Sequence, residues 1–382
     1  MEKVKVSLVK CDGYDIEKVY NAVKTSLDLI GGIDRLKAKG RRVLLKPNIL
    51  CGKEPDFAVT THPVIFEAAV RIFLENGFDV LAGDSPGLEN IFSAARKCGL
   101  LEVAEKYNVP FIEFKNEVKV SNPSGRIMKS LSISKEIINC DIIVSLPKLK
   151  THGQMYYTGA LKNLFGCISG IKKAHFHFRF PDREKFADLI VDLNLLLKPQ
   201  LGIMDGIVAM EGNGPQNGKP KKLGIVASSF DIAALDYVCA ELIGYNYKDI
   251  PIIRSAMERK NYFVSDPIDI EVVGEKLSEV RDIHFEKIRI PHSVHFLERR
   301  LPEKLRKFLD NLITPFPFFS RKKCIRCGKC IEICPAKALS FVESQKDKFV
   351  SVDYKKCIKC YCCDEICPVS AIKLKIRLFS FL

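Results

Sequence analysis

The sequence lacks the signals that mark several large classes of protein. None of its apolar runs reaches about 18 residues, the length that a membrane-spanning helix requires, so we expect no transmembrane segment. The first residues lead directly into a strand-like alternation, and we expect no signal peptide. Neither a G-x-G-x-x-G fingerprint nor a P-loop is present, which argues against the common nucleotide sites. No nucleic-acid-binding module is recognisable either, so nucleic acid is not expected as a partner.

Acidic residues are few relative to basic ones. The chain of 382 residues has 60 Lys and Arg against 46 Asp and Glu, a formal net charge of +14. Such an excess suits an anionic membrane face, an acidic redox partner or an anionic substrate, or it simply solvates a surface. Much of it lies in and near residues 281–320, where 294–313 has a basic helical pattern with a Phe and Leu face. We expect this segment to pack against the rest of the chain, with peripheral membrane contact as the alternative.

Cysteine, in contrast, is abundant, and its arrangement is the most specific pattern in the chain. The spacing C-x2-C-x2-C-x3-C occurs twice near the C-terminus, each time followed by proline. Its members are Cys324, Cys327, Cys330 and Cys334 in the first run, and Cys357, Cys360, Cys363 and Cys367 in the second. This is the ligand pattern of bacterial ferredoxins with two [4Fe–4S] clusters, because four soft thiolates complete one cluster. Disulfides would need an oxidising compartment, and zinc sites use other spacings.

The two runs are expected to exchange their fourth ligands. Three sulfurs of one tight loop reach one cluster, and we expect the fourth cysteine to start a helix that crosses to the other half. Cluster one is then held by Cys324, Cys327, Cys330 and Cys367, and cluster two by Cys357, Cys360, Cys363 and Cys334. Apolar cover is expected from Ile325, Ile331, Ile333 and Ile358. Cys362 has no place in the pattern and is expected to be a non-ligand.

The other six cysteines are scattered among apolar neighbours. Cys11, Cys51, Cys98, Cys140, Cys167 and Cys239 are expected to be small core residues. Because we expect these cysteines to stay reduced, we expect the protein in a reducing cytoplasm. The clusters favour an anaerobic host.

Residues 1–280 alternate strand and helix patterns, which predicts an α/β domain with a mainly parallel sheet and helices on both faces. The expected strands are 3–10, 42–45, 79–82, 110–114, 138–146, 201–210, 224–228 and 268–273, with a strand pair over 118–134. The expected helices are 16–30, 64–75, 181–197 and 231–242, with Thr60 or Thr61 as N-cap before Pro63 and Asp231 as a second cap. A basic helical linker (281–320), a small α+β ferredoxin-like domain (321–376) and a short tail (377–382) follow.

Polar residues gather where the predicted parallel strands end, which is where such sheets bind ligands. They are Lys46 and Asn48, then Asp84, then Lys148, Lys150 and His152, with Lys162 and Asn163 on the following helical stretch. Lysines in this position bind carboxylate or phosphate groups as point charges. A solvated loop is the alternative.

Two further stretches are chemically suggestive. His175 and His177 would share one face of a strand, where they could bind metal or relay protons, or form an ordinary polar surface. Asp205 and Glu211 precede the glycine-rich loop 212–218, in which the backbone can approach a ligand closely. They could hold a metal or act as acid and base, or they could cap turns.

Taken together, these motifs resemble the family of the domain of unknown function 362, often fused to a two-cluster ferredoxin module. The matching residues are Lys46-Pro47-Asn48, His62-Pro63, Gly83 to Pro86, Leu146 to His152, Gly159 with Lys162-Asn163, Asp205-Gly206 and Met210 to Pro215. The resemblance covers roughly residues 5–275 and implies the architecture and the importance of these loops, but no substrate. His152 and residues 159–162 are also similar in arrangement to the cofactor region of nickel-dependent lactate racemase. That similarity implies a related sheet domain, and we do not predict nickel.

These observations favour an iron–sulfur oxidoreductase. Electrons would pass through two [4Fe–4S] clusters to a small anionic substrate held by Lys46, Lys148, Lys150 and Lys162. His152 or His177 would supply the proton, and Asp84, Asp205 and Glu211 would bind a metal or carry a second proton. One alternative is a non-enzymatic electron-transfer or sensing subunit that docks a redox partner. Another is a protein of cofactor or cluster assembly.

Overall fold

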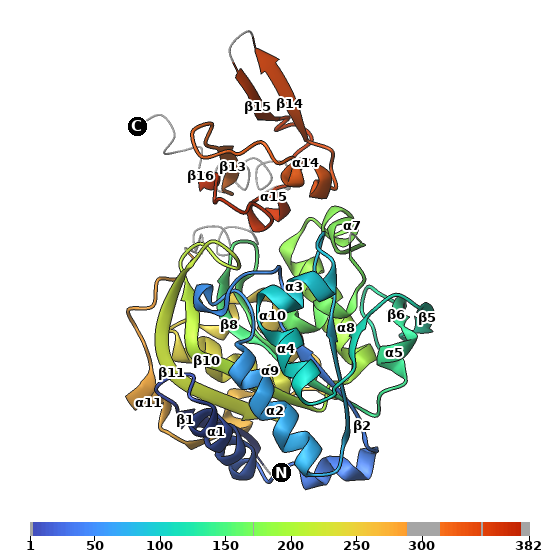
Figure 1. The fold of residues 1–382 in the computed structure, drawn as a ribbon, viewed down its shortest axis with the longest axis vertical. Coiled ribbons are helices and arrows are strands. Elements are labelled where there is room, and N and C mark those ends of the chain that lie inside the picture. The colour runs from blue at the N-terminus through green and yellow to red at the C-terminus, as the bar shows by residue number, and fades with distance from the viewer. Residues whose placement is uncertain (1–2, 171, 289–313, 345–346, 376–382) are drawn as a thin grey trace, which may run out of the picture. The chain divides into compact units, whose positions relative to one another are not determined.

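The computed structural model describes residues 3–170, 172–288, 314–344 and 347–375 (Figure 1). The chain divides into two compact units. The α/β unit comprises residues 1–173 and 182–287, and the second unit comprises residues 174–181 and 288–382. No described helix combines the length and apolar character needed to cross a membrane.

A ten-stranded sheet forms the centre of the α/β unit, with the main order β12-β1-β11-β10-β7-β2-β3-β4. Neighbours on this path pair in parallel except at β11, which is antiparallel to both β1 and β10. The strands are β1 (Val4–Lys10), β2 (Arg42–Pro47), β3 (Asp79–Asp84), β4 (Phe111–Glu113), β7 (Ile142–Leu146), β8 (Lys148–His152), β9 (Tyr156–Thr158), β10 (Leu201–Glu211), β11 (Lys219–Ser229) and β12 (Ile270–Gly274). A separate hairpin is formed by β5 (Glu117–Ser121) and β6 (Ser130–Ser134). The predicted mainly parallel α/β fold is confirmed.

The main helices of this unit are α1 (Ile16–Leu29), α2 (Pro63–Glu75), α3 (Ile91–Lys97), α4 (Leu100–Lys106), α5 (Lys135–Ile138), α6 (Ala160–Asn163), α8 (Arg183–Leu197), α9 (Ile232–Leu242), α10 (Pro251–Met257) and α11 (Leu277–Val280). Helices α1 to α4 share one core with alternate residues of the central strands, for example Val43 and Leu45 of β2. The opposite face is covered by α6 and α9. Gly202 shows why: a Cβ there would lie 2.6 Å from Leu235 of α9, so the glycine allows the close approach.

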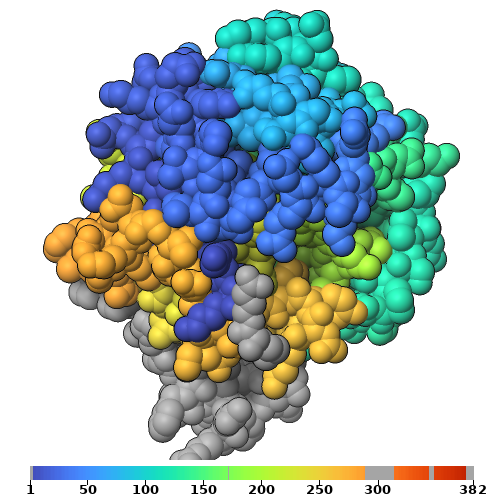
Figure 2. Space-filling model, turned by 90° about the horizontal axis from the view of Figure 1, so that it is seen from below, coloured from blue at the N-terminus to red at the C-terminus, as the bar shows by residue number. Residues whose placement is uncertain are grey.

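β12 returns to the first strand of the chain. It pairs in parallel with β1, from Val4↔Ile270 to Leu8↔Gly274. On the face seen in Figure 2, the N-terminal residues in blue therefore lie beside the orange segment that contains β12.

Several boundaries differ from those predicted. The N-cap of α2 is His62, whose Nδ1 accepts from the Val64 N–H, so the threonine cap was wrong, whereas the Asp231 cap of α9 is confirmed. Residues 138–141 precede β7 and include the end of α5. Residues 148–152 were expected as a loop, but they form the buried strand β8, which pairs with β10 and β9.

Residues 174–180 were predicted as a strand, which is wrong. They lie mostly in helix α7 (Lys172–Arg179), so His175 and His177, two positions apart, do not share a strand face. The apolar–polar alternation around the two histidines is too short to distinguish the period of a strand, about 2 residues, from that of a helix, about 3.6 residues.

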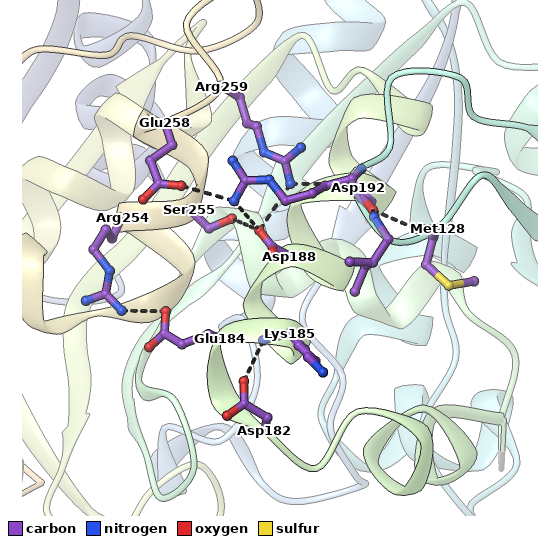
Figure 3. A network of polar contacts seen from close by, with 12 residues as sticks. Met128, Asp182, Glu184, Lys185, Asp188, Asp192, Arg254, Ser255, Glu258 and Arg259 are labelled. Atoms are coloured by element: carbon purple, nitrogen blue, oxygen red, sulfur yellow. Dashed lines mark hydrogen bonds and ion pairs between the residues drawn. The ribbon is translucent and has the colours of Figure 1, made fainter. Parts of the chain in front are cut away.

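A buried carboxylate on α8 fixes the turn between β5 and β6 (Figure 3). Asp192 is fully buried and accepts from three consecutive backbone N–H groups, those of Arg126, Ile127 and Met128, at 2.7, 2.7 and 2.8 Å. Arg259, which follows α10, donates to the same carboxylate at 3.2 Å. The turn, α8 and the end of α10 are thus joined at one side chain.

The second unit contains the cysteine runs. Its strands are β13 (Phe316–Phe319), β14 (Leu339–Ser344), β15 (Asp347–Val352) and β16 (Ile372–Lys375), in the antiparallel pairs β13–β16 and β14–β15. Two short helices, α14 (Lys329–Ile333) and α15 (Cys362–Glu365), come before the fourth cysteine of each run. The expected helix starting at that cysteine is therefore wrong. The basic helical pattern over 294–313 and the tail 377–382 lie outside the described residues.

Candidate functional site

Two buried ion pairs lie in the α/β sheet, the first of them at the ends of β2 and β3. The first joins Lys46 of β2 to Asp84 of β3, with Nζ 2.7 Å from Oδ1 and side-chain exposures of 0% and 3%. Lys46 Nζ also donates to the Asn163 side chain at 3.3 Å, and Asn163 Nδ2 donates back to the Lys46 carbonyl at 2.9 Å. Gly166 permits this packing, because a Cβ there would lie 2.0 Å from Asp84 Oδ1.

The second pair joins Lys148 of β8 to Asp205 of β10 at 2.8 Å, and neither side chain is exposed. The Tyr14 hydroxyl completes a triangle: it donates to Asp205 Oδ1 and accepts from Lys148 Nζ, both at 2.8 Å. Burial lowers the pKa of Lys148, and the Asp205 carboxylate opposes that shift. Burial and Asp205 together raise the pKa of Tyr14, so the phenol stays protonated.

His62 covers this triangle. Its ring stacks on the Tyr14 ring with centroids 3.4 Å apart, and its backbone N–H donates to Asp205 Oδ2 at 2.9 Å. Burial lowers the pKa of His62 to about 4, and the nearby Asp205 only partly opposes this. The imidazole is therefore neutral near pH 7.

Asn48 and Thr61 form a further set of polar contacts. Lys150 Nζ donates to Asn48 Oδ1 and to the Val59 carbonyl, both at 2.7 Å. The Asn48 N–H donates to Thr61 Oγ1, whose hydroxyl donates to the Leu146 carbonyl at 2.5 Å. The predicted residues thus fall into three sets of contacts: Lys46 with Asp84 and Asn163, Lys148 with Asp205, and Lys150 with Asn48.

Lys162 and Lys173 lie around the first pair. Lys162 is half-buried on α6, whose first N–H groups are held by the buried Asp236 carboxylate. Lys173 donates to the Ser85 carbonyl, and burial lowers its pKa to about 8 while Asp84 opposes the shift. The positive charges of Lys46 and Lys162 contribute to lowering the same pKa. The pKa of Lys173 thus depends on the charges of Asp84, Lys46 and Lys162.

A polar cavity of about 280 Å³ begins next to Asp84. Its lining includes the β3–α3 connection, residues 85–91, together with Glu113, Phe114, Ser169 and Gly170. The Gly170 N–H donates to Ser85 Oγ at 2.8 Å, which joins the two sides of the cavity wall. The hydrogen bond from Lys173 to Ser85 brings the amine to this wall.

Other predicted residues lie elsewhere in the unit or outside it. His152 is fully buried, and its Nδ1 accepts from the Gln154 and Met155 N–H groups at 3.2 Å. Glu211 accepts from the Glu286 N–H at 2.8 Å. His177 lies in the part of α7 that groups with the second unit.

Tyr14, His62 and Lys173 were not predicted as site residues. Tyr14 follows β1, whose carboxyl end lies on the same side of the sheet as that of β10, but it stands alone between polar residues in the sequence. His62 was recognised only as part of a family motif, and Lys173 looks like one residue of a surface-exposed basic pair with Lys172. Only the three-dimensional contacts identify them.

The eight cysteines of the two runs surround two cavities in the second unit. Cys324, Cys327, Cys330 and Cys367 line one, and Cys334, Cys357, Cys360 and Cys363 line the other. Each cavity thus has three cysteines of one run and the last of the other, which fits the donor set of a [4Fe–4S] cluster. Cys362 lines the second cavity as well, as a fifth cysteine. Apolar residues complete the walls, including Ile325 and Ile358, although Ile325 is 60% exposed.

The two runs also repeat each other in backbone conformation. Positive φ angles occur at Arg326 (60°), Gly328 (78°) and Lys337 (49°), and at the equivalent Lys359 (55°), Tyr361 (62°) and Ser370 (50°). The fourth cysteine of each run accepts a backbone N–H bond at its sulfur, from Ala338 at 3.3 Å and from Ala371 at 3.2 Å. Such bonds stabilise a thiolate ligand and raise its cluster's potential.

Comparison with known sequences agrees with this two-part architecture. The model of the family described as domain of unknown function (DUF362) matches residues 43–241, and that of the 4Fe-4S dicluster domain matches residues 318–374. This protein belongs to the DUF362 family. The predicted resemblance is confirmed, and the dicluster domain assigns iron–sulfur binding and electron transfer to the second unit of this DUF362 protein.

One curated relative extends over most of the chain. The thylakoid-associated protein sll1697 of Synechocystis sp. is 32% identical over 312 residues, which are 81% of this DUF362 chain and 95% of the relative. Among solved structures, the lactate racemase apoprotein of Thermoanaerobacterium thermosaccharolyticum is similar at a TM-score of 0.40 and 14% identity. That similarity covers 63% of this chain and 57% of the racemase, and it supports no statement about activity.

Proposed function

We propose that this DUF362 protein is an iron–sulfur oxidoreductase that acts on a small anionic substrate bound in the α/β unit. One observation carries the proposal: the chain that contains the dicluster domain also places the Lys173 amine at the Ser85 wall of a polar cavity, near the Lys46–Asp84 pair. An ammonium group in this position can bind a carboxylate or phosphate as a point charge. The cavity suits a compact molecule, since 280 Å³ corresponds to the volume of roughly nine water molecules.

In the second unit, we assign cluster one to Cys324, Cys327, Cys330 and Cys367, and cluster two to Cys334, Cys357, Cys360 and Cys363. When bound, clusters of this kind supply one-electron transfer. Thiolate ligation needs reduced cysteines, so a reducing cytoplasm is part of the proposal.

Lys173 is the group best suited to provide a proton. A general acid works best when its pKa lies near the working pH, and the pKa of Lys173 is about 8. His62 is a poorer donor, since its pKa of about 4 leaves it neutral. Lys46 has a different part: its ion pair with Asp84 keeps that carboxylate in place, close to the Ser85 wall of the cavity.

The first experiment is anaerobic purification, followed by iron and sulfide analysis, electron paramagnetic resonance of the reduced protein and identification of any co-purifying molecule. We expect about eight irons per chain, as two [4Fe–4S] clusters require. Cys363→Ser should reduce the iron content, whereas Cys362→Ser, one residue away, should not. A full iron content in Cys363→Ser would contradict the ligand assignment.

The substrate site is tested with neighbouring lysines. Lys173→Met should abolish binding of the co-purifying anion, or of acidic metabolites screened by calorimetry, without changing the iron content. Lys172→Met is the matched control, because Lys172 is exposed and its partner is Glu117 on the surface. Equal binding by both variants would remove the substrate site from the cavity.

A non-enzymatic electron-transfer subunit is the second candidate. It is favoured by the Lys148–Asp205 pair, whose full burial and hydrogen bonds to Tyr14 and His62 are also what a purely structural network requires. Clusters at full occupancy with no bound anion and no turnover would support this second function over the first.

A further inference from the structure

The first cysteine run carries an exposed basic surface. We call it the collar and define it as Arg321, Lys322, Lys323 and Arg326 around Ile325 and Cys327. All six residues are exposed, and Ile325 is 60% exposed. An apolar residue and a sulfur ligand of the proposed cluster one thus lie in the centre, with four cations around them.

Contacts to β15 hold two of the collar's cations, Arg321 and Arg326. The Arg321 guanidinium lies 3.7 Å from the centre of the Phe349 ring, and Arg326 Nε donates to the Lys348 carbonyl at 2.6 Å. Both contacts tie the collar to β15. Arg321, Lys322 and Lys323 form no ion pair with a carboxylate in the described part of the chain.

The equivalent surface of the second run is different, although the two runs repeat each other. The residue equivalent to Gly328 is Tyr361, which is buried and donates its hydroxyl hydrogen to the Pro315 carbonyl at 2.9 Å. Cys360, equivalent to the exposed Cys327, is buried. Lys356, equivalent to Lys323, has an ion-pair partner in Asp353 at 3.6 Å. Of the two runs, only the first therefore combines an exposed cysteine with basic residues that form no ion pair in the described part of the chain.

We propose that the collar is the docking surface for an acidic one-electron carrier protein, which exchanges electrons with cluster one. Opposite charges steer such encounters, and an apolar centre with a charged rim is the usual composition of a protein interface. A membrane is a poorer occupant, because a surface-bound segment needs several apolar residues and the collar offers Ile325 alone. The inference rests on the iron–sulfur part of the proposed function and not on the substrate site.

Each encounter transfers a single electron between the two proteins. The carrier is oxidised by one electron and this protein is reduced by one, or the reverse, and no proton or covalent bond is exchanged. An exposed ligand residue, Cys327, shortens the path between the two redox groups.

The test uses the full chain with its clusters and a charge reversal in each repeat. Lys322→Glu with Lys323→Glu changes the collar, and Lys355→Glu with Lys356→Glu makes the same change in net charge at the equivalent, also exposed, positions of the second run. A reduced flavodoxin serves as the acidic probe in anaerobic stopped-flow measurements at several salt concentrations. Methyl viologen, a small cationic reductant, serves as the control, and calorimetry measures flavodoxin binding independently of electron transfer.

We expect the collar variant to reduce the second-order rate with flavodoxin by about tenfold or more at low salt and to weaken its binding in parallel. The second-run variant should change the rate less than about threefold, and reduction by methyl viologen should not be slowed in either variant, because the charge effect is specific to the docking face.

Equal losses in both variants, or none in either, would overturn the proposal. So would an unchanged flavodoxin rate together with lost binding to phosphatidylserine-containing vesicles, which would identify the collar as a membrane contact. Absence of iron from the wild-type protein would instead mark a failure of the iron–sulfur assignment.

Discussion

Lysine side chains lie inside the α/β unit as well as on its surface. Lys46, Lys148 and Lys150 have exposures of 0%, 1% and 2%. A buried ammonium group is tolerated only when a carboxylate or several acceptors replace its hydration, and Asp84, Asp205 and Asn48 provide these contacts. Removing one partner of such a pair leaves a buried charge uncompensated and costs about 3–5 kcal/mol.

The Lys46–Asp84 ion pair can be tested directly by adding one methyl group at Gly166. In Gly166→Ala the new Cβ would lie 2.0 Å from Asp84 Oδ1 and 2.7 Å from Lys46 Nζ, so the ion pair must separate. We expect a loss of about 3 kcal/mol in the free energy of unfolding, measured by urea denaturation. Gly13→Ala is the control, since nothing lies within 4 Å of a Cβ there, and it should change the stability little. Similar effects of the two substitutions would contradict the packing described around Asp84.

His62 predicts a pH dependence of stability. Its pKa is about 4 in the folded protein, against about 6.5 in an unfolded chain. Between these values the unfolded state binds more protons, so stability is present above about pH 6.5 and is lost as the pH falls toward 4, by about 3 kcal/mol at most. His62→Asn retains an N-capping side chain and removes the titration.

We therefore expect the difference in unfolding free energy between wild type and His62→Asn to change between pH 6.5 and 4, with the wild type losing more. Urea denaturation at a series of pH values measures it. A difference that stays constant across this range would mean that the His62 ring titrates near its ordinary pKa.

At the scale of elements, the Asp192 contacts join α8, the turn after β5 and the end of α10 (Figure 3). Asp192→Asn would place an amide donor against backbone N–H groups and Arg259, and should destabilise the α/β unit by about 3 kcal/mol or more. Glu184→Gln, in the surface pair with Arg254, is the matched control, and its effect should stay below about 1 kcal/mol. Thermal unfolding of both variants gives the comparison, and a mild Asp192→Asn effect would mean that the turn is held by other contacts.

The sequence predicts most elements because their apolar periodicity reflects burial in the sheet. It is misleading where polar residues are buried. Lys148, Lys150 and His152 make β8 look like a loop, since a pattern of charged residues does not show that partners from β2 and β10 lie across from them. The iron–sulfur domain could be recognised because ligand spacing is a local property, whereas Tyr14 reaches Asp205 across 191 positions of the chain.

At the scale of the whole molecule, each unit has its own core. The core of the α/β unit includes residues of α1 to α4 and the central strands, whereas that of the second unit is small and includes Cys363 and Cys367 themselves. A small domain whose core contains metal ligands depends on the metal for its stability.

Removing iron should therefore affect the two units unequally. We expect removal of iron by a chelator, without acid treatment, to abolish hydrogen-exchange protection in β13 to β16. Protection in β1, β2, β7 and β10 should be retained. Mass spectrometry of peptides before and after chelation measures both in one sample. Loss of protection in the central sheet would show that the α/β unit needs the clusters to fold.

Because these lysines are buried, the rate of their covalent labelling can report local opening of the protein. An acylating reagent modifies amines that solvent can reach, so Lys46, Lys148 and Lys150 should remain unmodified in the native protein while exposed lysines such as Lys322 and Lys355 react at once. Modification of the three buried amines can begin only when the strands and loops around them separate. The rate of that acylation would record how often this part of the sheet opens.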